Sequence, residues 1–379
     1  LSFTEPWLGG KKPISFFTSI SHSKQFLYTG VTSSVDRSKS FNITSLSIGL
    51  AKRLTVPDDF FVLSNAISFQ YYDLNNYNTG LFTFGDGSSR NLAFTTSLTR
   101  NSKGDNPIFP TKGSEFSITA KFTLPYSKFN NINYGTLGDQ IEYKLRNKSE
   151  GFFGLDDTFI ATGDLIQQQT INGQTGYVKV NEANFADAEV DQALVDQKKF
   201  NWLEYYKLKF KGDTFLRLFG TPQKALVLKA LGEFGYLGAY DNNRGLVPFE
   251  RFFLGGDGLA NFALDGREVI QLRGYPNQSL SSQNGGTIYN KFSLEMRYPI
   301  TLKSSASIYV LGFLEAGGSY DSFKTYNPFV LQRSAGFGLR VFMPAFGLLG
   351  IDFGNGFDAV PGLTKPNGWE THFIIGQQF

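Results

Sequence analysis

Residues capable of catalysis are scarce in this chain of 379 residues. His22 and His372 are its only histidines, and it has no cysteine. The sequence contains no G-x-S-x-G motif, no phosphate-binding loop and no spacing typical of metal ligands. Carboxylates are numerous, but no acid–base pair can be recognised from their spacing. We therefore expect no catalytic residues, no bound metal and no cofactor, and we predict that the protein is not an enzyme.

One group of residues suggests ion pairing instead. The segment Leu272-Arg273-Gly274-Tyr275 lies in a long loop, 242–286, and is followed by Glu295 and Glu315 in the next two expected strands. A guanidinium has five donors and can bridge two carboxylates, which would otherwise repel each other. Glycine gives the loop tip the freedom to approach closely. We predict that Arg273 is hydrogen-bonded to Glu295, Glu315 or both; the alternative is a solvated loop arginine.

Composition excludes several classes of protein. The 36 basic and 33 acidic residues give a net charge of +3, which excludes a strongly basic nucleic-acid binder and an acidic disordered chain. The 39 Phe, 18 Tyr and 41 Gly indicate β-structure with many turns. No apolar run reaches the roughly 18 residues of a membrane helix. The opening residues 1–7 lack the features of a signal peptide, so we expect upstream sequence to be missing.

The elements that must position these residues are long strands with period-two alternation. Apolar side chains alternate with polar ones at 116–124, 287–300 and 335–343. A soluble β-sandwich also alternates, but these strands extend over about 11 to 16 residues, whereas a sandwich strand usually has 5 or 6. Membrane-spanning strands need at least about 9 to 11 residues, and Tyr and Trp gather near the strand ends. The sequence therefore predicts an all-β, antiparallel transmembrane β-barrel over 1–379.

We expect about twelve strands, with 1–7 as the end of a thirteenth. Their predicted ranges are 13–24, 41–54, 59–73, 90–102, 113–125, 200–219, 223–241, 287–300, 305–320, 331–343, 347–358 and 368–379. Short turns alternate with longer loops at 25–40, 74–89, 127–199, 242–286 and 359–367. Outer-membrane barrels place short turns in the periplasm and long loops outside the cell, which orients the chain.

The insertion 127–199 lacks sustained alternation. Its stretch Glu182–Asp196 is acidic and helix-prone, so we expect a folded extracellular insertion with one short helix. The alternative is a disordered loop. A loop of this length is uncommon unless it is functional or disordered, which makes it a candidate docking surface for surface-exposed partners.

Several motifs, in order along the chain, resemble the barrel of the BamA family of outer-membrane assembly factors of Gram-negative bacteria. The turn Phe109-Pro110-Thr111-Lys112-Gly113 resembles that family's periplasmic F-P-T-x-G turn. Leu272-Arg273-Gly274-Tyr275 resembles its (V/I)-R-G-(F/Y) motif at the tip of the sixth extracellular loop. The stretches 251–256, 333–336 and 373–379 resemble the approach to that tip and the closing strands.

The resemblance implies a sixteen-stranded barrel preceded by periplasmic POTRA domains, with loop 242–286 inside the lumen and Glu295 and Glu315 as acidic partners of Arg273. It also implies a function: folding and inserting outer-membrane proteins through a lateral seam by strand templating. The last strand, with Gly376 and Phe379, would form one side of that seam. The implied partners are unfolded outer-membrane proteins, accessory periplasmic and surface-exposed lipoproteins, and an outer-membrane bilayer containing lipopolysaccharide, without nucleic acid.

Some features depart from the family pattern. Aligned with the family by its turns, the sequence would begin near the end of the fourth strand, so we expect the POTRA domains and the first strands to be missing from it. Leu272 replaces the commoner Val or Ile, and the insertion is longer than the usual fifth loop. Gly350, Gly354, Gly356 and Gly376 either weaken the wall near the seam or allow close packing with a lumenal loop. The Gly255–Gly258 cluster is expected to be a turn. The alternative functions are a related two-partner-secretion or translocation barrel and a passive porin-like channel.

Overall fold

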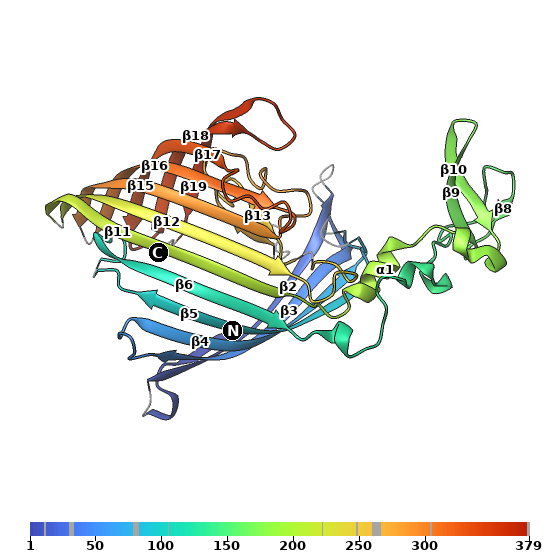
Figure 1. Cartoon of the computed structure of the whole chain (residues 1–379), viewed down its shortest axis with the longest axis horizontal. Coiled ribbons are helices and arrows are strands. Elements are labelled where there is room, and N and C mark those ends of the chain that lie inside the picture. The colour runs from blue at the N-terminus through green and yellow to red at the C-terminus, as the bar shows by residue number, and fades with distance from the viewer. Residues whose placement is uncertain are drawn as a thin grey trace.

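The computed structural model describes residues 1–10, 13–29, 34–78, 83–104, 106–221, 223–247, 249–259, 267–303 and 305–376. Its main feature is one antiparallel sheet of thirteen strands in which neighbours in sequence order are also neighbours in space (Figure 1). In order, the strands are β1 (Ser2–Glu5), β2 (Ile14–Thr29), β3 (Ser34–Arg53), β4 (Phe61–Asn75), β5 (Gly87–Asn101), β6 (Lys112–Thr123), β11 (Tyr206–Thr221), β12 (Lys224–Gly238), β15 (Ile288–Lys303), β16 (Ala306–Tyr320), β17 (Gln332–Met343), β18 (Gly347–Ala359) and β19 (Pro366–Ile375).

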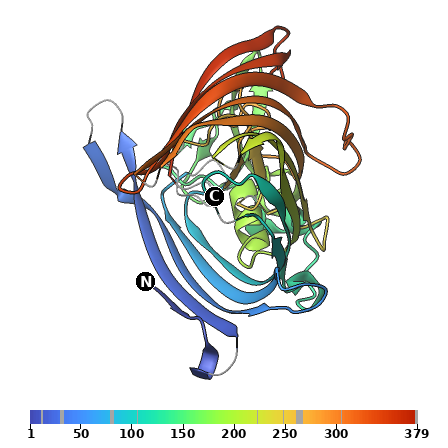
Figure 2. The same cartoon turned by 90° about the vertical axis from the view of Figure 1, so that its left-hand side faces the viewer.

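The sheet is strongly curved. Figure 2 shows the blue N-terminal strands along one side and the red C-terminal strands along the other. Within the described residues, β1 and β19 are the two edges and each pairs with a single neighbour. We call the space on the concave face of the sheet the lumen.

The two faces of the sheet have the polarity of a membrane barrel. On β15, Phe292, Leu294 and Met296 point outward and are 49%, 47% and 51% exposed. The alternate residues, such as Lys291 and Glu295, point into the lumen and are buried. A water-soluble sandwich buries its apolar face, whereas here the apolar face is exposed on the outside, as contact with lipid requires. The predicted barrel is therefore confirmed, and the sandwich is excluded.

All twelve predicted main strands are present, and the short thirteenth strand is β1. One predicted connection was wrong: residues 25–29 and 34–40 belong to β2 and β3 and do not form a long loop. The polar side chains of this stretch resemble a loop, but their backbones pair in register, for example Gln25 with Phe41. Consecutive connections lie at alternate ends of the sheet, and the two longest, between β6 and β11 and between β12 and β15, lie at the same end, which we call the long-loop end.

The insertion 127–199 is folded and projects from the long-loop end (Figure 1). Its elements are η2 (Tyr126–Lys128), η3 (Leu137–Asp139), η4 (Ile141–Tyr143), β7 (Phe152–Phe153), β8 (Phe159–Ile160), β9 (Leu165–Ile171), β10 (Gln174–Val180), η5 (Glu182–Asp187) and α1 (Gln192–Lys199). The expected short helix is present as α1, whose N-cap Asp191 accepts hydrogen bonds from two backbone N–H groups. The β9–β10 hairpin was not predicted, although its Asn172-Gly173 turn, with both φ angles positive, is a strong hairpin signal.

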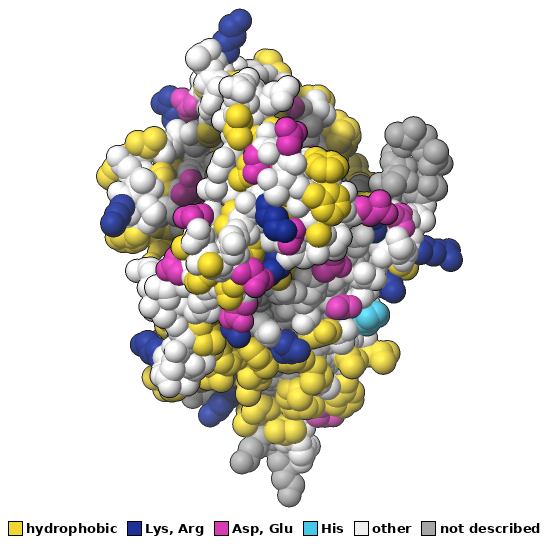
Figure 3. Space-filling view, turned by 90° about the vertical axis from the view of Figure 1, so that its right-hand side faces the viewer, with side chains coloured by type: hydrophobic (Ala, Val, Ile, Leu, Met, Phe, Trp, Pro, Cys, Tyr) yellow, Lys and Arg dark blue, Asp and Glu magenta, His cyan; other side chains and the backbone are white. Residues whose placement is uncertain are grey.

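The end of the molecule that carries the insertion has charged side chains of both signs (Figure 3). Figure 3, which views the molecule from the side of the insertion, shows basic and acidic side chains interspersed among apolar ones. No helix within the described ranges is long and apolar enough to cross a bilayer. A short 3₁₀ turn, η1 (Leu8–Gly10), separates β1 from β2.

Candidate functional site

The long loop between β12 and β15 folds back into the lumen and forms a small structure there. β13 (Phe252–Leu254) and β14 (Glu268–Ile270) pair in parallel, and Gly256 exchanges two backbone hydrogen bonds with Leu272. Phe252, Leu254 and Leu272 are each fully buried. These side chains belong to an apolar cluster that the loop shares with wall residues such as Phe41 and Tyr289, and this packing fixes the position of the tip.

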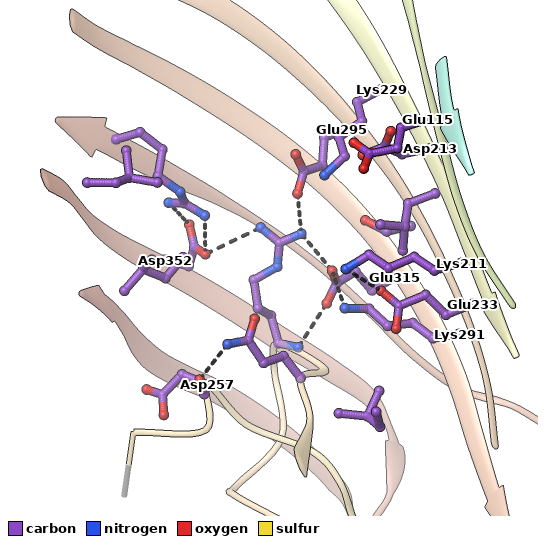
Figure 4. A pocket seen from close by; sticks show the side chains of 18 of the residues that line it. Glu115, Lys211, Asp213, Lys229, Glu233, Asp257, Lys291, Glu295, Glu315 and Asp352 are labelled. Carbon is purple, nitrogen blue, oxygen red and sulfur yellow. Dashed lines mark hydrogen bonds and ion pairs between the residues drawn. The ribbon is translucent and has the colours of Figure 1, made fainter. Parts of the chain in front are cut away.

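The structure brings Arg273 together with both predicted glutamates. Its Nη2 lies 2.7 Å from Glu295 Oε1 and 2.6 Å from Glu315 Oε1, and its backbone N–H donates to Glu315 Oε2 at 2.9 Å. Its Nη1 donates to Asp352 Oδ2 at 3.3 Å (Figure 4). The guanidinium also lies over the ring of Phe313, 3.8 Å from its centroid. The side chain is thus bound to three strands, and the alternative of a solvated arginine is excluded.

Each carboxylate in this network also has a second cation. Glu295 accepts from Arg297 at 2.5 Å, and Asp352 accepts from Arg340 at 2.6 and 2.7 Å. Lys291 lies 3.7 Å from Glu315. The group therefore contains three carboxylates, those of Glu295, Glu315 and Asp352, and four cations, those of Arg273, Lys291, Arg297 and Arg340. We call these seven residues the lumenal charge network. Asp352 and the three additional cations were not predicted. Lys291 and Arg297 alternate with Glu295 on β15, which was a signal that the sequence offered, whereas Arg340 and Asp352 depend on how the curved wall brings β17 and β18 to the loop tip.

The loop tip is anchored on the last three strands. Gly274 N–H donates to His372 Nε2 on β19 at 2.8 Å, and Asn367 Nδ2 donates to Gly274 O at 2.9 Å. Tyr275 donates its hydroxyl to Arg333 O on β17 at 2.7 Å. Gly274 has φ = 86°, and a Cβ there would lie 2.8 Å from Ser334 Cβ. Only glycine suits both the backbone angle and the space at this position.

The wall glycines make room for this tip. A Cβ on Gly354 would lie 2.7 Å from Gly274 N, and one on Gly356 would lie 2.5 Å from Gly274 O. Gly350 faces Arg340 in the same way, at 2.9 Å. Close packing with the lumenal loop is therefore the role of Gly354 and Gly356, whereas Gly350 makes room for the side chain of Arg340 on the neighbouring wall strand β17. Gly376 differs, since nothing lies within 4 Å of its Cβ position; it follows the end of β19. Phe379 is outside the described residues.

A second anchor holds the base of the loop. Glu250 is bound to Lys121 at 2.6 Å, Lys207 at 3.1 Å and the Tyr205 hydroxyl at 2.7 Å. Burial by itself would raise the pKa of Glu250, but the two lysines hold it well below the ordinary value. Glu268 shares Lys207, at 2.7 Å. The one sign of this anchor in the sequence is a carboxylate two residues before β13.

The turn Phe109–Gly113 closes the opposite end of the lumen. Phe109 is 1% exposed, and its ring meets that of Tyr309 edge-on at 5.3 Å. Pro110 is buried beside it, and Thr111 leads into β6. Gly113 has φ = 92°, and a Cβ there would lie 2.1 Å from Ser102 O. Two lumenal aromatic residues of β16 are therefore packed from inside, Tyr309 by this turn and Phe313 by Arg273.

Between the loop and the turn lies a cavity of about 610 Å³, lined by charged side chains of both signs (Figure 4). Most of these charges are already paired with one another. Among the residues that the structure describes, no group of His, Asp and Glu is arranged to hold a metal ion. The site is suited to holding a loop against a wall.

Comparison with known proteins identifies the family. The model of the Omp85 superfamily domain matches residues 185–379, just over half of the chain. The chain belongs to the Omp85 superfamily. Its structure is similar to that of BamA from Haemophilus ducreyi lacking POTRA domains 1–3, with a TM-score of 0.57 and 14% identity over 99% of this chain and 61% of that one. CdiB from Escherichia coli gives a TM-score of 0.47 and 10% identity, over 95% and 49% of the two chains.

These likenesses show an Omp85 fold, which is the fold of an outer-membrane β-barrel. A comparison with curated protein sequences gave no match. The chain spans about three fifths of the length of the BamA structure, so the activity of a whole protein of that kind is a matter for proposal.

Proposed function

We propose that this Omp85 barrel folds and inserts outer-membrane proteins by templating their strands on the edge of β19. The observation that carries this proposal is the anchoring of the lumenal loop tip on β17, β18 and β19. A loop that serves only to narrow a pore has no need to contact the strand that ends the sheet. Here the tip is bound to that strand through His372 and Asn367.

The mechanism follows from the chemistry of an unpaired edge. In lipid, every backbone N–H and C=O group must find a partner, so a free strand edge is costly. An incoming strand can satisfy β19 by β-augmentation, and the next strand can then pair with the newcomer. The driving free energy is the client's own folding and its burial in lipid, and no nucleotide or cofactor takes part. The lumenal charge network holds the wall beside the edge in shape while this happens.

The partners of this reaction are unfolded outer-membrane proteins in an outer membrane that contains lipopolysaccharide. The end with short turns would face the periplasm and meet accessory periplasmic lipoproteins. The insertion 127–199 would lie outside the cell, where it offers a docking surface for surface-exposed lipoproteins. Limited proteolysis of intact cells tests this: a bare insertion is cut first, whereas protection that persists in the purified barrel argues against docking. Nucleic acid has no part in the proposed function, and the barrel is not an enzyme.

Reconstitution tests the assembly function directly. The protein is placed in liposomes, a urea-unfolded outer-membrane barrel protein is added, and its folding is followed as the heat-modifiable band on a semi-native gel. We expect faster folding than in empty liposomes, and cross-linking of the client to a photoreactive residue at position 371 on the β19 edge. Folding at the rate of empty liposomes would contradict the proposal. Export of an added secretion partner without client folding would instead indicate a two-partner-secretion barrel.

A further inference from the structure

One contact of the lumenal loop lies on the edge of β19 itself. In an antiparallel pair, the N–H and C=O of one residue point to the same side, and successive residues point to opposite sides. Gly376 N donates to Leu348 O on β18 at 2.9 Å, so the even-numbered residues of β19 face β18. The odd-numbered residues, including Phe373, therefore present their backbone groups to the side on which the described residues place no partner strand.

Asp257 of the lumenal loop occupies that side. Phe373 N–H donates to Asp257 Oδ2 at 3.1 Å. The other carboxylate oxygen accepts from Leu259 N at 2.9 Å and from Asn277 Nδ2 at 3.1 Å. One oxygen thus fixes the carboxylate in the loop and leaves the second one directed at the strand edge. Burial by itself would raise the pKa of Asp257. The hydrogen bonds from Leu259 and Phe373 outweigh burial and leave the pKa below its ordinary value, so the acceptor is charged.

The position of Asp257 is set by the same loop body that carries Arg273. Gln271 Nε2 donates to Asp257 O at 2.8 Å, and the neighbouring Gly256 is paired with Leu272. The glycine-rich turn is needed for this geometry: Gly256 has φ = 75°, and a Cβ there would lie 2.1 Å from Asn277 Oδ1. The Gly255–Gly258 cluster, which the sequence analysis expected to be only a turn, therefore presents a carboxylate to the edge strand.

We propose that Asp257 is a cap on the β19 edge, which an incoming client strand must displace before it can pair there. This inference rests on the proposed function, because it identifies the edge of β19 as the surface that meets client strands. A strand that pairs with β19 must supply a carbonyl oxygen that accepts from Phe373 N–H, which is the donor that now bonds to Asp257. The cap therefore competes directly with β-augmentation and shields the edge from non-specific strands when no client is present.

Hydrogen exchange at a single amide tests the cap. The full chain is placed in lipid nanodiscs, and the exchange rate of the Phe373 amide is measured by NMR. We expect Asp257→Ala to raise that rate about tenfold, since a hydrogen bond to a charged acceptor is lost. Asp257→Asn keeps an acceptor oxygen without the charge and should have a smaller effect. The amide of His372 faces β18 and should be unchanged in both variants, which shows that the barrel remains folded.

A matched control lies in the same loop. Asp241 accepts a backbone hydrogen bond from Asn243 within the loop, so Asp241→Ala removes a similar carboxylate far from the β19 bond. It should leave the Phe373 amide unchanged. An unchanged Phe373 rate in Asp257→Ala, in a protein that remains folded, would overturn the cap.

Binding of a strand provides the second measurement. The probe is a fluorescent peptide that copies residues 115–124, which alternate between apolar and polar side chains. Asp257→Ala should bind it about five- to tenfold more tightly than the unmodified protein, because no cap has to be displaced. Faster exchange with unchanged peptide affinity would overturn the competition. If both effects are present but the unmodified protein fails to fold clients in liposomes, the cap stands and the proposed function is wrong.

Discussion

Removing the guanidinium of Arg273 should destabilise the barrel by about 3 kcal/mol. Stripping one partner from a buried ion pair costs about 3–5 kcal/mol when the other charge is left alone. Arg273 has three carboxylate partners, but each keeps another cation when it is lost: Arg297, Lys291 or Arg340. The remaining cost is the lost charge-assisted hydrogen bonds and the contact with Phe313, which places Arg273→Ala at about 3 kcal/mol, near the lower limit of that range.

The assay is reversible urea unfolding in detergent micelles, followed by tryptophan fluorescence and by trypsin cleavage of the loop. Arg273→Lys keeps the charge but loses the planar fork, so about 1–2 kcal/mol of destabilisation is expected. Arg333→Ala is the matched control: this arginine on β17 is 64% exposed and paired with Asp358, so its loss should matter much less. An Arg273→Ala barrel as stable as the unmodified one, with its loop equally resistant to trypsin, would refute the reasoning.

Three further predictions concern the parts that surround the network. Phe109→Ala should lower the free energy of unfolding by about 3 kcal/mol because a buried ring is lost, whereas Phe129→Ala, at a side chain 74% exposed, should barely change it. The carboxylate of Glu250 has a lowered pKa, so the stability that it contributes is present above pH 4.5, its ordinary pKa, and is lost as the pH falls below that value. Glu250→Gln should remove this acid-dependent loss of stability, which unfolding curves measured between pH 7 and pH 3 would show. Gly362→Ala, at φ = 88° in open space, should lower the free energy of unfolding by roughly 1–2 kcal/mol through left-handed strain alone. Gly274→Ala should lower it by more, because its Cβ would also collide with the wall. Equal unfolding midpoints for the two variants would contradict the close approach of the tip.

Most of the fold could be predicted from the sequence because the strands of a membrane barrel alternate between apolar and polar residues, with the apolar face outward. Alternation over more than ten residues identifies a strand, and the choice of face then follows from lipid. The failures occurred where local sequence and pairing disagree. The described residues of the polar stretch 25–40 pair mainly with one another at the end of the β2–β3 hairpin, almost wholly beyond the reach of β1 and β4, and the hairpin at Asn172-Gly173 was missed although its turn residues are diagnostic.

The candidate site could be predicted only where its members lie on adjacent strands. Glu295 and Glu315 are on β15 and β16, so the order of the chain already makes them neighbours. Asp352 reaches Arg273 from a strand two places further round the wall, and Asp257 reaches Phe373 across 116 positions of sequence. Neither distance follows from periodicity, because both depend on how far the sheet curves and how deeply the loop enters the lumen.

The two kinds of loop contact differ in strength, and that difference gives them different roles. The lumenal charge network joins Arg273 to three carboxylates, and breaking even one buried pair costs about 3–5 kcal/mol. The contact of Asp257 with the β19 edge is one hydrogen bond to a charged group, which contributes about 1.5–3 kcal/mol. Under the proposed function, a client strand that replaces this bond with its own therefore frees the edge while Arg273 still holds the loop. The barrel can expose its edge without losing the loop that fills its lumen.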